Sequence, residues 1–183
     1  MRAASLVLLV LSPARPAATA DPSDVAAVIR KFKHKDPKMS RVFASAYGYA
    51  VFPTVGKGGL GIGAARGKGY VYRRGQLIGR STLTQVTIGL QFGGQAYSEV
   101  IFFKDAAALD NFEKGKLKLD AQASAIALTA RASADLAYRN GVAIVTMAKG
   151  GLMYEASVGG QKFSYQPMGN SSRAFARREA DVY

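Results

Sequence analysis

Few side chains in this sequence could support nucleophilic or acid-base catalysis. The chain has no Cys and a single His, His34, so a thiolate nucleophile and a two-His metal site are both excluded. His34 lies in a run of lysines, and we do not expect it to serve in a Ser-His-Asp arrangement. We therefore interpret His34 as a surface residue of a helix.

Two acidic residues could form the paired carboxylates of a glycoside hydrolase if the fold brought them together. Glu99 is the single acid between Tyr47 and Phe103, and Glu155 lies in a later expected strand. We instead expect each to pair with one of the many basic residues or to cap a sheet edge. A hydrolase is therefore only a third hypothesis, and we predict a protein without catalytic residues, metal ligands or cofactors.

A glycine-rich stretch invites comparison with nucleotide-binding loops. Residues 59–63 read G-x-G-x-G, but the spacing of a dinucleotide fingerprint does not follow. Gly56-Lys57 lacks both the upstream Gly and the following Ser or Thr of a phosphate loop. These glycines are more typical of tight strand packing or bulges.

Positive charge is the strongest feature of the composition. The formal net charge is +13, which favours anionic lipid, nucleic acid, or an acidic protein or polymer as partner. One set of basic residues lies near the start of the chain and another on expected loops of a sheet. The residues that we assign to binding an anionic lipid surface are Arg30, Lys31, Phe32, Lys33, Lys35, Lys38, Arg41, Lys57, Arg66, Lys68, Arg73 and Arg74. A solvated basic surface that only aids solubility is the alternative.

The first twenty residues have the order of a secretory signal peptide. Met1-Arg2 is followed by the apolar run 3–11 and then by Ala18-Thr19-Ala20, which predicts cleavage before Asp21. The apolar run is too short to span a bilayer as a helix. Cleavage would remove two basic residues and no acid, which leaves a charge of +11. We therefore expect a periplasmic or secreted protein.

The remaining chain predicts helices followed by a sheet. Residues 21–35 form one expected helix and 37–46 a second, with Asp36 as the cap of the second. We expect strands at 49–52, 60–65, 69–72, 76–92 and 95–103, with a loop at 56–59 and a hairpin at Gly93-Gly94.

The second half adds a helix and further strands. Asp105 caps an expected helix over 105–114, and strands follow at 142–148, 151–159 and 162–166. The segment 117–130 is ambiguous, with strand favoured for its first half, and Asn140-Gly141 is an expected turn. The fold class is α+β: N-terminal helices packed on a largely antiparallel, strongly curved or barrel-like β-sheet with an inserted helix. Residues 21–167 form one domain, and 168–183 form a flexible basic tail.

The first expected helix is amphipathic. Its apolar residues recur at helical spacing, and the same side chains cannot both pack on the sheet and enter lipid. They are Val25, Val28, Ile29 and Phe32. We expect packing on the sheet, with release onto a membrane as an option.

The stretch from Gly48 to Tyr165 resembles the SYLF domain, also called the Ysc-type actin-binding or lipid-binding domain. The resemblance rests on residues 49–53 (YAVFP), on residues 55–63 and above all on residues 85–103, a Gln/Gly-rich strand pair that continues into Tyr97-Ser98-Glu99. Asn140-Gly141 stands where the family often has an aromatic-Gly pair.

The resemblance implies a non-enzymatic module that binds anionic phospholipids, with phosphoinositides as the eukaryotic ligands. It places lysines 31, 33 and 35 where the family has a basic N-terminal segment. Eukaryotic relatives also bind actin, which we do not expect for an exported protein, and we expect no nucleic acid partner. We therefore predict peripheral binding to anionic membranes, with an envelope structural protein that recognises an acidic polymer or protein as the alternative. The sequence leaves the oligomeric state open.

Overall fold

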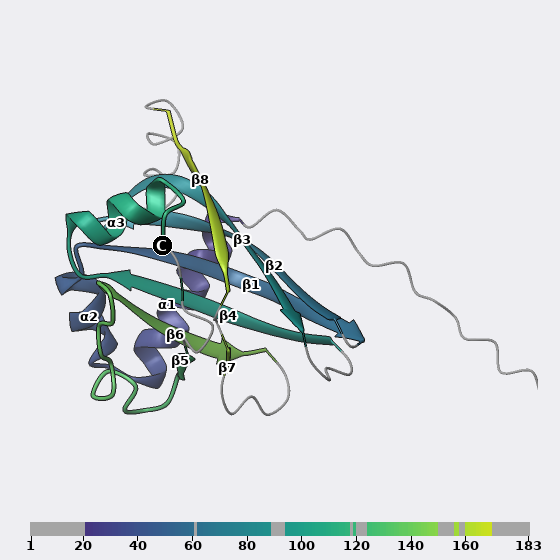
Figure 1. Ribbon diagram of the computed structural model, residues 1–183. Helices are drawn as coiled ribbons and strands as arrows, with labels where there is room; N and C mark the ends of the chain where they lie inside the picture. Colours follow the sequence, from purple (N-terminus) through teal and green to yellow (C-terminus); the bar gives the residue numbers. More distant parts are fainter. Residues whose placement is uncertain are drawn as a thin grey trace, which may run out of the picture.

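A computed structural model describes residues 21–60, 62–88, 94–117, 119, 124–149, 156–157 and 160–169. The helices are α1 (Pro22–Lys35), α2 (Met39–Ser45) and α3 (Ala106–Glu113). The strands are β1 (Gly48–Leu60), β2 (Ile62–Arg73), β3 (Gln76–Ile88), β4 (Gly94–Phe103), β5 (Ser124–Ala127), β6 (Val142–Ala148), β7 (Ala156–Ser157) and β8 (Lys162–Pro167). Figure 1 shows these elements as one curved sheet with helices on both sides.

The strands follow the order β7-β5-β6-β4-β1-β2-β3-β8. Every neighbouring pair is antiparallel except β5 and β6, which are parallel. The sheet is curved but its two outer strands are not joined to each other within the described residues. The predicted α+β class, with helices on a largely antiparallel and curved sheet, is confirmed.

Three details of the expected strand layout are wrong. The expected strands 60–65 and 69–72 are one continuous strand, β2, so Arg66 and Lys68 lie within a strand and not on a loop. The glycine-rich residues 56–59 are not a loop, because β1 continues through them and pairs with both β2 and β4. The expected hairpin pairing of the third and fourth strands is absent among the described residues, because β4 pairs with β1 and β6 while β3 pairs with β2 and β8. Gly93 itself, the predicted signal peptide at residues 1–20, Glu155 and the tail beyond Gly169 lie outside the described residues.

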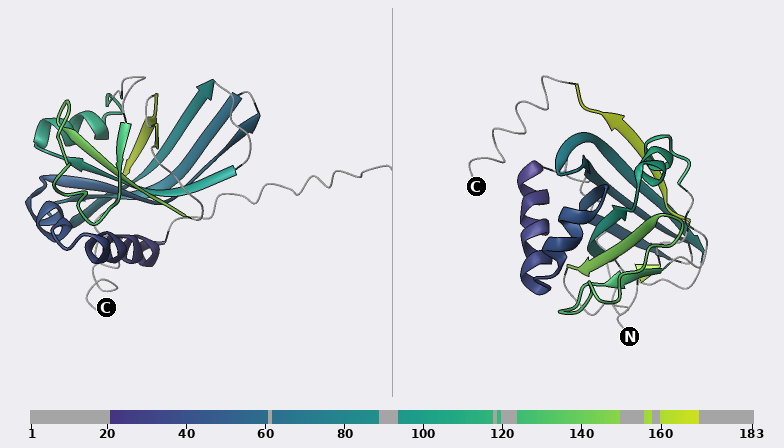
Figure 2. Two further views of the ribbon diagram at one scale, coloured as in Figure 1. Left: turned by 90° about the horizontal axis from the view of Figure 1, so that it is seen from below. Right: turned by 90° about the vertical axis from the view of Figure 1, so that its left-hand side faces the viewer.

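The sheet has a core on each face, and α1 and α2 lie on the opposite side from α3 (Figure 2). We call the side that carries α1 and α2 the outer face and the side that carries α3 the inner face. Tyr49, Val51 and Val100 belong to the outer core, whereas Phe52 and Leu83 belong to the inner core. A register shift in β1 between Val51 and Thr54 changes which positions face outward.

Local sequence signals account for the helix ends. Asp21 caps α1, where its Oδ1 accepts a hydrogen bond from the backbone N–H of Ser23 at 2.8 Å, and Asp24 completes a capping box. Asp105 caps α3 through the N–H of Ala108 at 2.9 Å. The positive φ of 65° at Gly115 lies just after α3, as the predicted helix end requires.

The second helix is anchored by a buried carboxylate. Asp36, which is 1% exposed, accepts from the N–H of Lys38 at 3.0 Å and from the N–H of Ser133 at 2.8 Å. Hydrogen bonding by Ser133 lowers the pKa of this carboxyl group. The α1–α2 junction is therefore tied to a loop from the second half of the chain.

Candidate functional site

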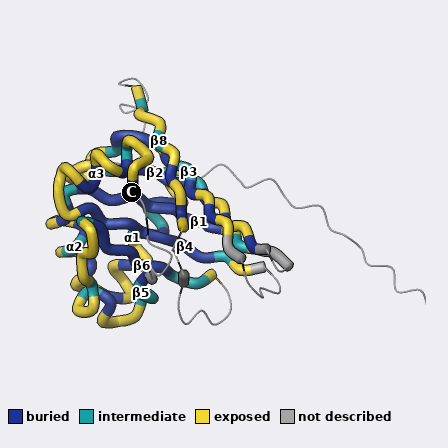
Figure 3. The backbone as a smooth tube through the Cα atoms, in the orientation of Figure 1, coloured by how far each residue is buried: buried dark blue, intermediate teal, exposed yellow. Residues whose placement is uncertain are grey.

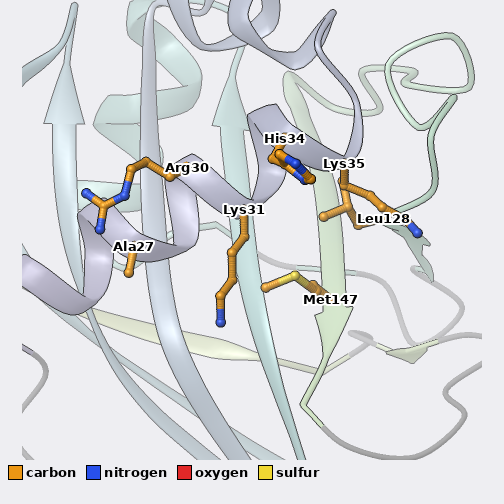
Figure 4. A pocket seen from close by; sticks show the side chains of 7 residues that line it. All are labelled: Ala27, Arg30, Lys31, His34, Lys35, Leu128 and Met147. Atoms are coloured by element: carbon orange, nitrogen blue, oxygen red, sulfur yellow. The ribbon is translucent and has the colours of Figure 1, made fainter.

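A surface groove lies between α1 and the β5–β6 edge of the sheet. Its volume is about 520 Å³. The lining residues are Ala27, Arg30, Lys31, His34, Lys35, Leu128 and Met147. The rim is basic, whereas Ala27, Leu128 and Met147 supply apolar surface. In Figure 4 the side chain of Lys31 descends from α1 beside Met147, while Arg30 and Lys35 extend toward opposite ends of the groove.

The helical period explains how the basic residues reach this groove. Val25, Val28 and Phe32 are buried against the outer face, so the positions between them project away from the sheet. Arg30 and Lys31 occupy two of those positions and are exposed. The cations are thus held by a helix whose orientation is fixed by its packed apolar side.

Further positive charge lies beside the groove. Lys149 follows β6, and its Nζ donates a hydrogen bond to Thr54 Oγ1 on β1 at 2.6 Å. Burial and the nearby Lys31 lower the pKa of Lys149, while Asp24 acts in the opposite direction. Lys31 and Lys149 are therefore close enough to interact, which marks this part of the outer face as a place where an anion would be stabilised.

The structure brings only part of the predicted N-terminal set together. Arg30, Lys31 and Lys35 line the groove with His34, which is an exposed helical residue as predicted. Lys33 instead projects toward α2, where its Nζ lies 5.6 Å from the ring centroid of Phe43.

The two remaining members of that set lie beyond the lining of the groove. Lys38 lies at the start of α2 and Arg41 lies within it, and both are exposed.

The structure places Phe32 in the core and not on the surface. Its side chain is 0% exposed and packs edge-to-face against Phe43, with ring centroids 6.4 Å apart. The expectation that the apolar side of this helix packs on the sheet is confirmed. Assigning Phe32 to a lipid-contacting surface is wrong for this conformation, because its whole side chain is already used in packing.

The predicted basic loops do not share one end of the sheet. Arg73 and Arg74 lie at the β2–β3 turn, level with Gly48 at the start of β1. Lys57 is nine residues further along β1, so roughly 30 Å separates the two ends at about 3.3 Å per residue. Arg73 is also engaged in a salt bridge with Glu113 at 2.8 Å.

The same register separates Lys57 from its predicted partners by face. Lys57 pairs with Ala65, which belongs to the inner core, so Lys57 faces inward. Arg66 and Lys68 alternate with Ala65 along β2 and face outward, on the same side as α1. Of the loop set, only Arg66 and Lys68 therefore share a face with the groove.

A second hollow lies at the opposite end of the sheet from Lys57, with a volume of about 480 Å³. Arg74 and Lys104 line it, and the guanidinium carbon of Arg74 lies 5.4 Å from the ring centroid of Tyr47. Its lining exposes less apolar surface than that of the first groove.

The inner core contains a buried carboxyl group. Glu99 is 0% exposed, and Gln161 Nε2 donates a hydrogen bond to its Oε2 at 3.0 Å. Burial raises the pKa of Glu99 to about 7. The expectation that Glu99 pairs with a basic residue or caps a sheet edge is wrong, because β4 is an interior strand and the partner is an amide.

Sequence reasoning missed three residues that define these sites. Leu128 and Met147 form the apolar floor of the groove, and Gln161 is the partner of Glu99. The alternation of β6 could have indicated that Met147 shares a face with Val145, but the position of α1 above it depends on tertiary packing. Nothing in the local sequence around Gln161 indicates a buried position.

Two further observations bear on the kind of protein. No helix in the described part of the chain is both long and apolar enough to cross a membrane. Among the described residues, no three His, Asp or Glu side chains lie together in a way that could hold a metal ion.

Comparison with known proteins gives two matches. Residues 84–175, half of the chain, match the family described as "Ysc84: Las17-binding protein actin regulator". The chain is also 29% identical over 140 residues to "Beta cell expansion factor A" of Aeromonas veronii. That alignment covers 75% of this chain and 52% of the relative, so the chain spans about half the length of the curated relative.

Proposed function

Because this chain belongs to the Ysc84 (SYLF) family, we propose that it is a binding module that docks on anionic phospholipid membranes through the groove beside α1. Membership of this family suggests lipid-related or actin-related binding. We favour a lipid because one surface combines clustered cations with apolar side chains. The cations complement anionic headgroup phosphates, and the apolar side chains complement the hydrocarbon beneath them.

The observation that carries the proposal is the composition of the groove. Arg30, Lys31 and Lys35 can meet phosphate oxygens, and Lys149 adds a fourth charge nearby. The apolar floor can contact the glycerol and first methylene groups of the same lipid. An acidic polymer would use the cations and leave the floor without a partner.

Electrostatics sets the expected strength. A basic residue near an anionic membrane contributes about 1 kcal/mol, so four of them give about 4 kcal/mol before any apolar contact. That energy supports reversible, salt-sensitive association. We further propose export to the periplasm or medium on the basis of residues 1–20. An exported protein would not meet intracellular actin, so we do not propose actin as its partner.

Vesicle co-sedimentation with paired variants tests the proposal. Lys31→Gln with Lys35→Gln removes two groove charges and should weaken binding to anionic vesicles by about 2 kcal/mol, or about 30-fold. Lys114→Gln with Lys116→Gln removes the same charge from exposed positions after α3 and should change binding far less. Equal losses of affinity in both double variants would show that binding depends on net charge alone and not on the groove. An absence of binding by the wild-type protein would contradict the proposal.

A further inference from the structure

The outer face of the β2–β3 hairpin extends beyond the part that α1 covers. Val86 pairs with Ala64, and the next outward pair along the hairpin is Thr84 with Arg66. Tyr70, closer to α1, is 3% exposed, whereas Val86 is 71% exposed. Figure 3 shows the same change from buried to exposed backbone toward the far end of these strands. Part of the sheet face is therefore open to its surroundings and carries a large apolar side chain.

This open face is strongly cationic. The basic residues that the register places on it are Arg66, Lys68, Arg80 and Lys162. Residues 48–88, which contain β1, β2 and β3, include six basic and no acidic residues. A solvent-exposed valine is unremarkable alone, but here it lies among cations that local acids do not neutralise. The combination is complementary to an anionic interface with an apolar layer beneath it.

The hairpin face is continuous with the groove beside α1. Lys68 pairs with Thr54 on β1, and the side chain of Thr54 accepts the hydrogen bond from Lys149. Lys149 in turn interacts with Lys31 at the edge of the groove. The groove and the hairpin face are therefore parts of one continuous cationic surface.

Phe32 is fully buried, so an apolar contact with lipid must come from another side chain, and the hairpin carries a suitable one. Binding that depends on apolar contact requires an exposed apolar side chain, and Val86 is the most exposed large one in the described part of the chain. We propose that the β2–β3 hairpin is a second membrane-contacting element, in which Val86 enters the interface of an anionic bilayer while Arg66 and Lys68 meet headgroup phosphates. This inference rests on the proposed function and adds the element and side chain that enter the lipid.

Tryptophan substitution tests the inference directly, because the chain contains no Trp. A Val86→Trp variant places one indole on the hairpin face. A Gln95→Trp variant places one at an exposed position on β4, opposite Lys57 and therefore on the inner face near the same end of the sheet. Both variants are mixed with anionic vesicles, with and without brominated acyl chains, and binding is followed by co-sedimentation of the same samples.

We expect a blue shift and bromine quenching for Val86→Trp and neither change for Gln95→Trp. We also expect Val86→Asp to bind vesicles about tenfold more weakly, since burying a valine is worth about 1.5 kcal/mol. Sedimentation of Val86→Trp without quenching, or equal quenching in both variants, overturns the hairpin contact and leaves the groove proposal intact. Failure of the wild-type protein to sediment overturns both proposals. Circular dichroism of each variant confirms that the exposed substitutions leave the fold unchanged.

Discussion

Replacing Glu99 with Gln should stabilise the protein relative to wild type, and the gain in unfolding free energy should be larger at neutral pH than at acidic pH. Glu99 lies in the inner core, and its Oε1 has no hydrogen-bond partner among the described residues. Tyr97 is the titratable group that interacts with it, because the charge of Glu99 contributes to the raised pKa of Tyr97 after burial. A charged carboxylate in this position is therefore poorly compensated.

The sign of the effect follows from the two pKa values. Burial raises the pKa of Glu99 from its ordinary 4.5 to about 7 in the folded state. Below pH 4.5 both states hold the proton, and as pH rises the unfolded chain releases it first. The unfolding free energy of the wild-type protein therefore decreases as the pH rises from about 4.5 to 7. A rise in the pKa from 4.5 to about 7, at about 1.4 kcal/mol per pKa unit, corresponds to about 3.5 kcal/mol, and about 3 kcal/mol of this is lost between pH 4.5 and 7.5.

Urea unfolding at pH 4.5, 6.0 and 7.5, followed by far-ultraviolet circular dichroism, measures this loss. The difference in unfolding free energy between Glu99→Gln and wild type should shift by about 3 kcal/mol in favour of the variant across this range. Asp110→Asn, an exposed acid paired with Lys114, serves as the control and should give a difference that changes little with pH. Parallel curves for Glu99→Gln and wild type would refute the assignment of Glu99 as a buried group that titrates near neutrality.

Three further predictions concern stability, and urea unfolding measures all of them. Asp36→Ala removes the acceptor of two backbone hydrogen bonds, including that from Ser133, and should cost about 2–3 kcal/mol. Because hydrogen bonding by Ser133 lowers the pKa of Asp36, the ionised carboxylate stabilises the folded state above the ordinary aspartate pKa, and this stability is lost as the pH falls through the pKa of the folded state. A loss of stability in Asp36→Ala that stays constant down to acidic pH would contradict this assignment. Gly69→Ala would place a Cβ against the carbonyl oxygen of Val51, so we expect strong destabilisation, and a near-neutral result would show that the β1–β2 contact is looser than described. Phe32→Ala should cost about 3–5 kcal/mol because the side chain is fully buried, whereas a loss below 1 kcal/mol would indicate that α1 is not packed on the sheet.

Local signals in the sequence were sufficient for several elements. The cap at Asp105 depends on residues within three positions, and the structure confirms it. The turn at Asn140-Gly141 is also confirmed, with φ values of 50° and 80° that this residue pair tolerates. These features are set by short-range hydrogen bonds and backbone preferences, which a single sequence records.

The sheet pairing could not be predicted in the same way. Residues 56–59 contain three glycines, which locally favour a loop, yet β2 and β4 pair with them on either side and extend the strand. Strand β4 lies between β1 and β6, and its partners in β1 are 36 to 55 residues earlier in the chain, so the glycines near residue 93 gave a misleading signal for a hairpin. Non-local hydrogen bonding overrides local preference in both cases.

The candidate site was only partly predictable for a related reason. An amphipathic helix has the same sequence pattern whether its apolar side meets a sheet or a bilayer, so the pattern could not assign Phe32. The separation of Lys57 from Arg66 depends on the register shift in β1, which reverses the outward positions beyond Val51. Charge composition therefore indicated the class of partner, while the fold selects which cations share a surface.

The central claim is that the wild-type protein binds anionic bilayers through a basic and partly apolar outer face. Co-sedimentation with vesicles of neutral lipid, and with vesicles that contain anionic lipid, at low and high salt, tests it most directly. We predict binding to the anionic vesicles alone, weakened but not abolished by salt because apolar contact persists. Absence of binding under every condition would contradict the claim and would favour an acidic polymer or protein as the partner.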